Sequence, residues 1–233
     1  MLVMAVAAMS MVSGAMAQEN EMKMFQFAVL KTAGTVTMNQ EEAAKKQKQH
    51  LGYLKWLMDK GKAVAVGPLA DGGDMRGLVV FDVGSVDAAK ALMADDPFVK
   101  AGVMAADVYG WYAASKTFGK PTAGFLDIEP CTIGFLHRPS DAPSFTDEEL
   151  KSIQAGHMAN IHKMAADGVL AAAGPMAEAP FRGLFVFPST DRKAIEGWIA
   201  PDTAIQKKRL ECRLYTWYVA KGVIPPFKGE KFV

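Results

Sequence analysis

Two histidine–aspartate combinations recur along the chain at matched spacing, and they are the residues best suited to chemistry. His50 is followed by Asp96 after 46 residues, and His157 by Asp202 after 45. An imidazole exchanges protons near neutral pH. A carboxylate partner would fix its tautomer and raise its basicity, as general acid–base chemistry needs. The pattern therefore indicates proton transfer. The alternative is a buried hydrogen bond that merely holds a helix to a loop.

The sequence around each histidine is also repeated, which indicates a tandem duplication. The first copy reads H-L-G-Y-L from His50, then G-P-L, R-G-L-V-V-F, D-D-P-F and Y-G-W-Y. The second reads H-M-A-N-I from His157, then G-P-M, R-G-L-F-V-F, P-D and Y-T-W-Y. An offset of 106 or 107 residues is too long for a solenoid, whose period is about 20–50 residues, and it predicts two domains. The predicted boundaries are repeat 1 at 18–114, a linker at 115–127, repeat 2 at 128–221 and a tail at 222–233.

Composition limits the classes of function. The 233 residues carry a net charge of +1, and half of them are hydrophobic. Such a balance is ordinary for a globular chain with a core, and it gives no electrostatic reason to expect a nucleic-acid or membrane partner. Cys131 and Cys212 lack the spacing of a zinc site. We expect two buried thiols, because the predicted fold places them near opposite ends of neighbouring strands.

The first 17 residues differ in kind from the rest. Residues 2–12 are apolar apart from Ser10, and the sequence A-M-A before Gln18 fits a signal-peptidase site. The apolar run is too short to span a bilayer, which takes about 20 residues. We therefore predict a signal peptide over residues 1–17 and a periplasmic or secreted protein. A buried N-terminal helix is the alternative.

Each copy shows the order strand, helix, strand, strand, helix, strand, which is typical of the ferredoxin-like split βαβ fold. Asn39 with Glu42, and Thr146 with Glu149, predict capping boxes at the start of the two long helices. The strands expected in repeat 2 are 132–137, 169–173, 184–187 and 214–218. Each sheet has one face that its helices cannot cover. Two sheets that pack against each other through these faces would bury both uncovered faces. The fold class is thus α+β, with tandem ferredoxin-like repeats forming a pseudo-dimeric α+β barrel within one chain.

The motifs H-L-G-Y-L, G-P-L, D-D-P-F and Y-G-W-Y resemble those of the YCII-related domain family, and the second copy is similar. The second copy departs at one motif, where Pro201-Asp202-Thr203 replaces Asp95-Asp96-Pro97. The resemblance implies a dimeric α+β barrel with an active site at His50 and Asp96, and by extension at His157 and Asp202. Related barrels include muconolactone isomerases, and some members of the family are dehydrochlorinases.

The main hypothesis is therefore a small-molecule enzyme of isomerase or lyase type, in which a histidine is the base or acid and an aspartate orients it. It would act on a small organic molecule, without a cofactor or metal, and the chains could associate further. One alternative is a non-catalytic module that binds or senses a small apolar ligand. Another is haem ligation by His50 or His157. Arg76 and Arg182, which recur before a strand, could bind an anion or could simply be exposed.

Overall fold

A computed structural model describes residues 21–34, 36 and 38–225; the predicted signal peptide lies outside them. Repeat 1 contains β1 (Met22–Thr32), α1 (Gln40–Asp59), β2 (Ala63–Pro68), β3 (Met75–Phe81), α2 (Val86–Ala94), α3 (Pro97–Lys100) and β4 (Met104–Ala114). Repeat 2 contains β5 (Ile128–His137), α4 (Asp147–Ala166), β6 (Ala172–Ala177), β7 (Gly183–Phe187), α5 (Arg192–Ile199), α6 (Thr203–Gln206) and β8 (Glu211–Ala220). Among the described residues, no helix is both long and apolar enough to cross a membrane.

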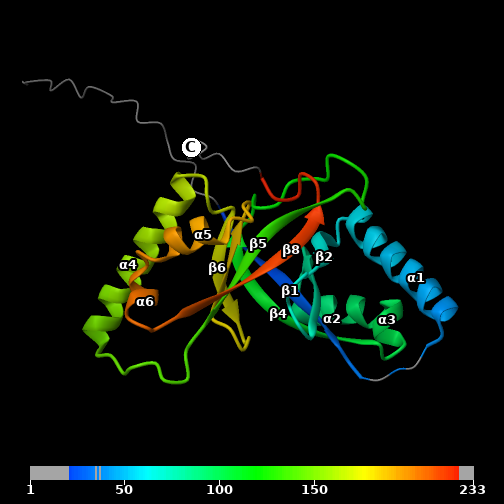
Figure 1. Cartoon of the computed structure of the whole chain (residues 1–233), viewed down its shortest axis with the longest axis horizontal. Coiled ribbons are helices and arrows are strands. Elements are labelled where there is room, and N and C mark those ends of the chain that lie inside the picture. The colour runs from blue at the N-terminus through cyan, green and yellow to red at the C-terminus, as the bar shows by residue number, and fades with distance from the viewer. Residues whose placement is uncertain (1–20, 35, 37, 226–233) are drawn as a thin grey trace, which may run out of the picture.

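The eight strands form one antiparallel sheet that nearly closes on itself. Their order is β2-β3-β1-β4-β6-β7-β5-β8, so each repeat supplies four neighbouring strands. The helices of repeat 1 lie on one outer side of the strands and those of repeat 2 on the other (Figure 1). This arrangement confirms the predicted pair of ferredoxin-like repeats that build an α+β barrel within one chain.

Two seams join the repeats. At the first, β4 pairs with β6 through Gly110 and Ala177. At the second, the β2 end of repeat 1 reaches β8: the backbone N–H of Ala70 donates to the Thr216 carbonyl at 3.0 Å. The indole N–H of Trp217 also donates to the Gly67 carbonyl at 3.2 Å. The second seam therefore joins residues about 150 positions apart in the sequence.

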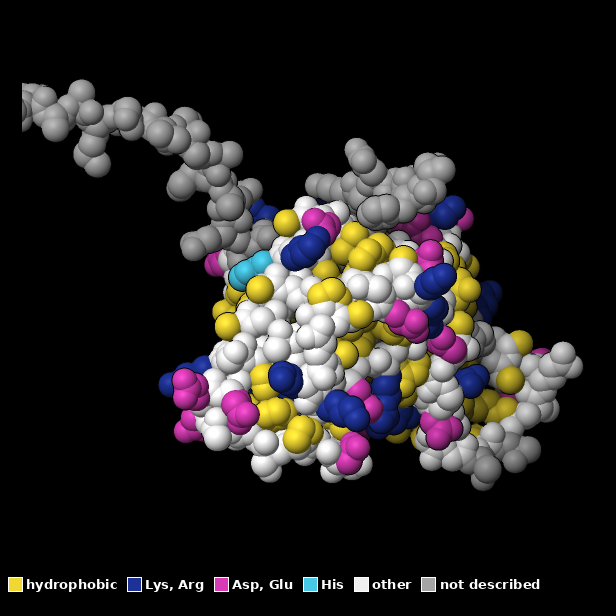
Figure 2. Space-filling model, turned by 60° about the vertical axis from the view of Figure 1, so that its left-hand side comes forward, with side chains coloured by type: hydrophobic (Ala, Val, Ile, Leu, Met, Phe, Trp, Pro, Cys, Tyr) yellow, Lys and Arg dark blue, Asp and Glu magenta, His cyan; other side chains and the backbone are white. Residues whose placement is uncertain are grey.

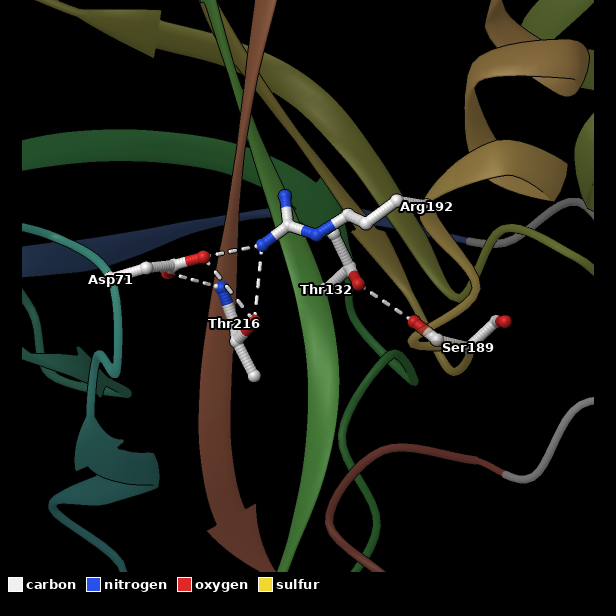
Figure 3. Close-up of polar contacts among 5 residues, drawn as sticks. All are labelled: Asp71, Thr132, Ser189, Arg192 and Thr216. Atoms are coloured by element: carbon white, nitrogen blue, oxygen red, sulfur yellow. Dashed lines mark hydrogen bonds and ion pairs between the residues drawn. The ribbon is translucent and has the colours of Figure 1, made fainter.

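A polar cluster reinforces the second seam (Figure 3). Asp71, in the loop after β2, accepts a hydrogen bond from the backbone N–H of Thr216 at 2.7 Å. The guanidinium of Arg192, at the start of α5, lies 2.6 Å from the same carboxylate and donates to the Thr216 hydroxyl at 3.0 Å. One loop of repeat 1 is thus tied to both a strand and a helix of repeat 2.

The core has an inner layer and two outer layers. Along β1, Phe25, Phe27 and Val29 belong to the cluster inside the barrel. The alternate residues Ala28 and Leu30 pack outwards against the helices. This alternation follows from the period of two in a strand. Aromatic rings from both repeats pack against one another inside the barrel, among them Phe27, Phe135 and Phe181.

The long helices begin where the sequence predicts, and each is followed by a glycine. Asn39 and Thr146 each form a complete capping box with the glutamate three residues on. Gly61 and Gly168 follow the helices with φ of 63° and 72°, a left-handed conformation that glycine adopts without strain. Each helix turns a histidine towards the sheet, and both of these histidines are buried.

Two local predictions need correction. Strand β6 covers Ala172–Ala177 rather than 169–173, because its last residues pair with β4 across the first seam. That pairing involves the other repeat, so local pattern does not reveal it. Cys131 and Cys212 are both free thiols, and they lie opposite Trp217 and Leu136, at different ends of the β5–β8 ladder. Cys131 is buried as expected, but Cys212 is only partly buried.

Candidate active site

The structure brings both predicted pairs together. His50 Nδ1 lies 2.7 Å from Asp96 Oδ2, and His157 Nδ1 lies 2.7 Å from Asp202 Oδ2. Both carboxylates are fully buried, whereas the histidines keep 6% and 9% of their surface exposed. Each repeat thus presents an imidazole whose inner side is held by a buried carboxylate.

The position of each aspartate is fixed by a short helix that it caps. Asp96 Oδ1 accepts from the Phe98 N–H at 2.8 Å at the start of α3. Asp202 Oδ1 accepts from the Ala204 N–H at 2.8 Å at the start of α6. One carboxylate oxygen therefore holds the helix while the other holds the imidazole. The change from Asp-Pro to Asp-Thr in repeat 2 leaves this geometry intact: the backbone angles are φ −61°, ψ 132° at Asp96 and φ −64°, ψ 119° at Asp202.

This arrangement sets the chemistry available to the imidazole. An ionised carboxylate can only accept hydrogen bonds, so the Nδ1 atom bound to it has to be the donor. The other ring nitrogen, Nε2, then carries the lone pair. No residue that the structure describes forms a hydrogen bond with Nε2 of His50 or His157. Both imidazoles are thus oriented to accept a proton through Nε2, which is the geometry of a general base.

Two further residues support the pairs, and sequence reasoning missed both. The Tyr53 hydroxyl donates to the Leu92 carbonyl at 2.8 Å, and the Asn160 side-chain amide donates to the Trp198 carbonyl at 3.1 Å. Tyr53 and Asn160 each lie three residues after the histidine, on the same helix face. Each ties the histidine's helix to the helix just before the aspartate. Their equivalent positions in the two copies could have indicated a shared role. Because one is a phenol and the other an amide, comparison of the residue types did not reveal it.

The surroundings of the two histidines differ. The ring of Phe98 lies 4.8 Å from that of His50. The position equivalent to Phe98 in repeat 2, by the spacing from the aspartate, is Ala204. His157 instead lies parallel to Phe185, with 6.1 Å between ring centroids. The aromatic neighbour of the histidine therefore comes from the short helix in repeat 1 and from the sheet in repeat 2.

A cavity of about 540 Å³ opens at His157. It lies between α4 and the outer face of the sheet, and its size falls within the range of about 300–1,000 Å³ that is usual for small-molecule sites. Apolar side chains form much of its wall, and its basic residues are three arginines. Its lining residues are Met22, Leu136, Arg138, Gln154, His157, Met158, Ile161, Ala173, Gly174, Pro175, Arg182, Gly183, Phe185, Arg209 and Leu210. Of the four predicted site residues, His157 is the one that this cavity reaches.

The other candidates from the sequence are placed as follows. Arg182 lines the cavity, whereas its counterpart Arg76 is an exposed residue of β3. Within the part of the chain that the structure describes, no group of three or more histidine, cysteine or acidic side chains could hold a metal ion.

Comparison with known proteins agrees with the fold. The model of the YCII-related domain matches residues 24–111. This stretch of repeat 1 is therefore similar to the YCII-related domain. Repeat 2 has the same element order as this domain and the same His–Asp geometry. A search of the curated proteins found no match to the chain.

Solved structures with this barrel include a mutant chlorite dismutase from Candidatus Nitrospira defluvii in complex with cyanide. It has 6% identity and a TM-score of 0.55, over 85% of this chain and 91% of that chain. A haem-binding protein from Thermus thermophilus has 10% identity and a TM-score of 0.50, over 85% and 92% of the two chains. At such low identity, these likenesses establish the fold alone.

One match is closer in sequence but shorter. It is 5-chloro-2-hydroxyhydroquinone dehydrochlorinase from Burkholderia phenoliruptrix, in complex with 2,5-dihydroxybenzoquinone. It has 28% identity and a TM-score of 0.28, over 37% of this chain and 90% of that chain.

Proposed function

We propose that the protein is a small-molecule enzyme that transfers protons through a His–Asp pair, as an isomerase or a lyase. The observation that carries the proposal is His157: its Nδ1 is bound to a buried carboxylate, and its ring lines a cavity large enough for a small organic molecule. His50 with Asp96 is the repeat 1 counterpart. We assign turnover chiefly to repeat 2, because that is where the described cavity meets an imidazole.

In the proposed reaction, His157 Nε2 accepts a proton from a carbon atom of the substrate. The electron pair of the broken C–H bond then forms a new C=C bond. In a lyase, a leaving group such as chloride departs with its own bonding pair. In an isomerase, the electron pair of an adjacent C=C bond moves to a second carbon, and that carbon takes the proton back from the imidazolium. Asp202 stabilises the imidazolium and fixes the ring, so it is a positioning residue.

The test is a screen of lactones and chlorinated ring compounds for turnover, followed by His157→Gln and His50→Gln on any substrate found. A positioned general base contributes about 10²–10⁴-fold in rate. We expect a loss of that size in kcat for His157→Gln and a smaller loss for His50→Gln. Asp202→Asn should lower kcat and shift the pH profile with KM little changed. Turnover that survives His157→Gln unchanged would refute the proposal.

The competing function is binding without turnover, and the apolar wall around Leu136, Ile161 and Phe185 favours it. The ligand would be a small apolar molecule, and its binding would persist when His50 and His157 are both changed to alanine. Haem is a separate possibility, since a histidine backed by a carboxylate is a common metal-ligand arrangement. When bound, haem would supply its own iron chemistry, and His157 would be the ligand. A Soret band that appears on haem addition and is lost in His157→Ala would decide for haem.

We also propose that the protein works in the periplasm or outside the cell. The support is the apolar run and the A-M-A sequence within residues 1–17. N-terminal sequencing of the protein purified from its source should begin at Gln18. An N-terminus that retains residues 1–17 would contradict export by this route.

A further inference from the structure

The cavity at His157 is strongly basic for a protein with almost no net charge. Arg138, Arg182 and Arg209 line it, and no aspartate or glutamate does. We infer that this cavity binds a small organic carboxylate, with the three arginines holding the carboxylate group. The identity of the substrate class rests on the proposed function, whereas the binding site can be tested without it.

The three arginines lack the partners that surface arginines commonly have. Arg192 and Arg213 form ion pairs with Asp71 and Glu211. None of the cavity arginines forms an ion pair with a residue that the structure describes. Their charges are therefore available to a ligand. A guanidinium presents its N–H groups in a planar fork that matches a carboxylate, which makes arginine well suited to this role.

Comparison of the repeats shows that the basic cluster is specific to repeat 2. By the offset of 106 residues that relates the sheets, Arg182 corresponds to Arg76, but Arg138 corresponds to Thr32 and Arg209 to Val103. Duplication alone would have placed one arginine at the cavity. Repeat 2 has two more arginines beside the histidine that the cavity reaches, which favours a role in binding a charged ligand there.

The geometry separates the charged and apolar parts of the site. Arg138 and Arg182 are exposed and Arg209 is half-buried, so they form the mouth of the cavity. His157 is buried, and the side chains around it are apolar. Figure 2, which brings the repeat 2 side forward, shows basic side chains lying among exposed hydrophobic ones on that side of the molecule. An acid with an apolar body would place its carboxylate at the mouth and its carbon skeleton near His157 Nε2.

The experiment uses para-fluorobenzoate as the probe, with binding to the full chain followed by fluorine NMR. We expect Arg182→Gln and Arg209→Gln each to weaken binding about tenfold or more, because each removes a charge-assisted hydrogen bond to the carboxylate. Arg76→Gln is the matched control in repeat 1 and should leave binding unchanged. The neutral analogue para-fluorobenzamide should bind much more weakly. Inorganic phosphate should compete poorly, because it has no apolar part to pack against the wall of the cavity.

Three outcomes would overturn the inference: no binding of the probe, equal binding of the benzamide, or equal effects of Arg76→Gln and Arg182→Gln. Strong competition by phosphate would show a general anion site instead of a carboxylate site, and would also overturn it. His157→Gln should keep most of the binding, because the arginines hold the charge. Probe binding that depends on the arginines, together with no turnover of any compound, would leave this inference standing and remove only the proposed enzyme function.

Discussion

Replacing Gly67 with alanine should open the second seam of the barrel. A Cβ added there would lie 1.7 Å from the Tyr218 carbonyl oxygen, whereas real Cβ contacts are essentially never under 3.0 Å. The backbones of β2 and β8 would have to part by about 1.3 Å, the difference between these two distances. That movement would break the hydrogen bonds that cross the seam from Ala70 and Trp217.

The expected cost follows from those contacts. Two lost hydrogen bonds contribute about 1 kcal/mol each, and forced separation of packed backbone adds about 1–3 kcal/mol. Gly67→Ala should therefore lower the free energy of unfolding by about 3–5 kcal/mol, a large share of the roughly 5–15 kcal/mol that holds a typical domain. Urea unfolding followed by tryptophan fluorescence measures this loss.

The matched control is Gly52→Ala on the exposed side of α1. A Cβ at Gly52 meets nothing within 4 Å. Alanine is a better helix former than glycine by about 0.5–1 kcal/mol, so this variant should be slightly more stable than the parent. If Gly67→Ala unfolds at the same urea concentration as Gly52→Ala, the barrel does not depend on the seam in the way argued here.

Three further predictions concern groups outside the cavity. Burial raises the pKa of both the Cys131 and Cys212 thiols to about 12, so at pH 8 both should react with Ellman's reagent only on unfolding; fast reaction of the native protein would contradict this. Burial, and then the nearby Arg213, lower the pKa of His137. The unfolded chain therefore takes up a proton near pH 6.5 before the folded chain does, and stability should fall as the pH drops below 6.5. In His137→Gln, the free energy of unfolding from urea titrations should fall less between pH 7 and pH 5 than in the parent protein. An equal fall in the two proteins would show that His137 is not the group responsible. Tyr53→Phe should lower the free energy of unfolding in urea by about 1 kcal/mol, since it removes one hydrogen bond between helices. An unchanged free energy would show that this hydrogen bond does not stabilise the fold.

Much of the architecture could be predicted because each local sequence signal occurs in both repeats. Capping residues, strand alternation and the glycines after the helices are local signals, and the fold follows them. The pairing of His50 with Asp96 was also predictable, because periodicity does not require an imidazole and a carboxylate to recur in two copies at spacings of 46 and 45 residues.

The seams could not be predicted, because they depend on residues that lie close only in the closed barrel. Gly67 and Gly174 look like ordinary strand ends in the sequence. In the structure each is a position where a carbonyl of the other repeat approaches within 2 Å of where a Cβ would be. The location of the cavity was equally hidden. Its lining comes from α4, several strands and the segment before β8, and no periodic pattern in the sequence connects these residues to His157.

The duplication itself explains why the two sites can differ. In a barrel assembled from two identical chains, any change near one histidine appears near the other. Here both halves belong to one chain, so each can change independently. Repeat 1 keeps Phe98 against His50, where an aromatic ring covers the imidazole. Repeat 2 has Ala204 at that position and three arginines around a cavity. In both repeats the His–Asp pair links the long helix to the short one, α1 to α3 and α4 to α6, and in repeat 2 the imidazole also lines the cavity.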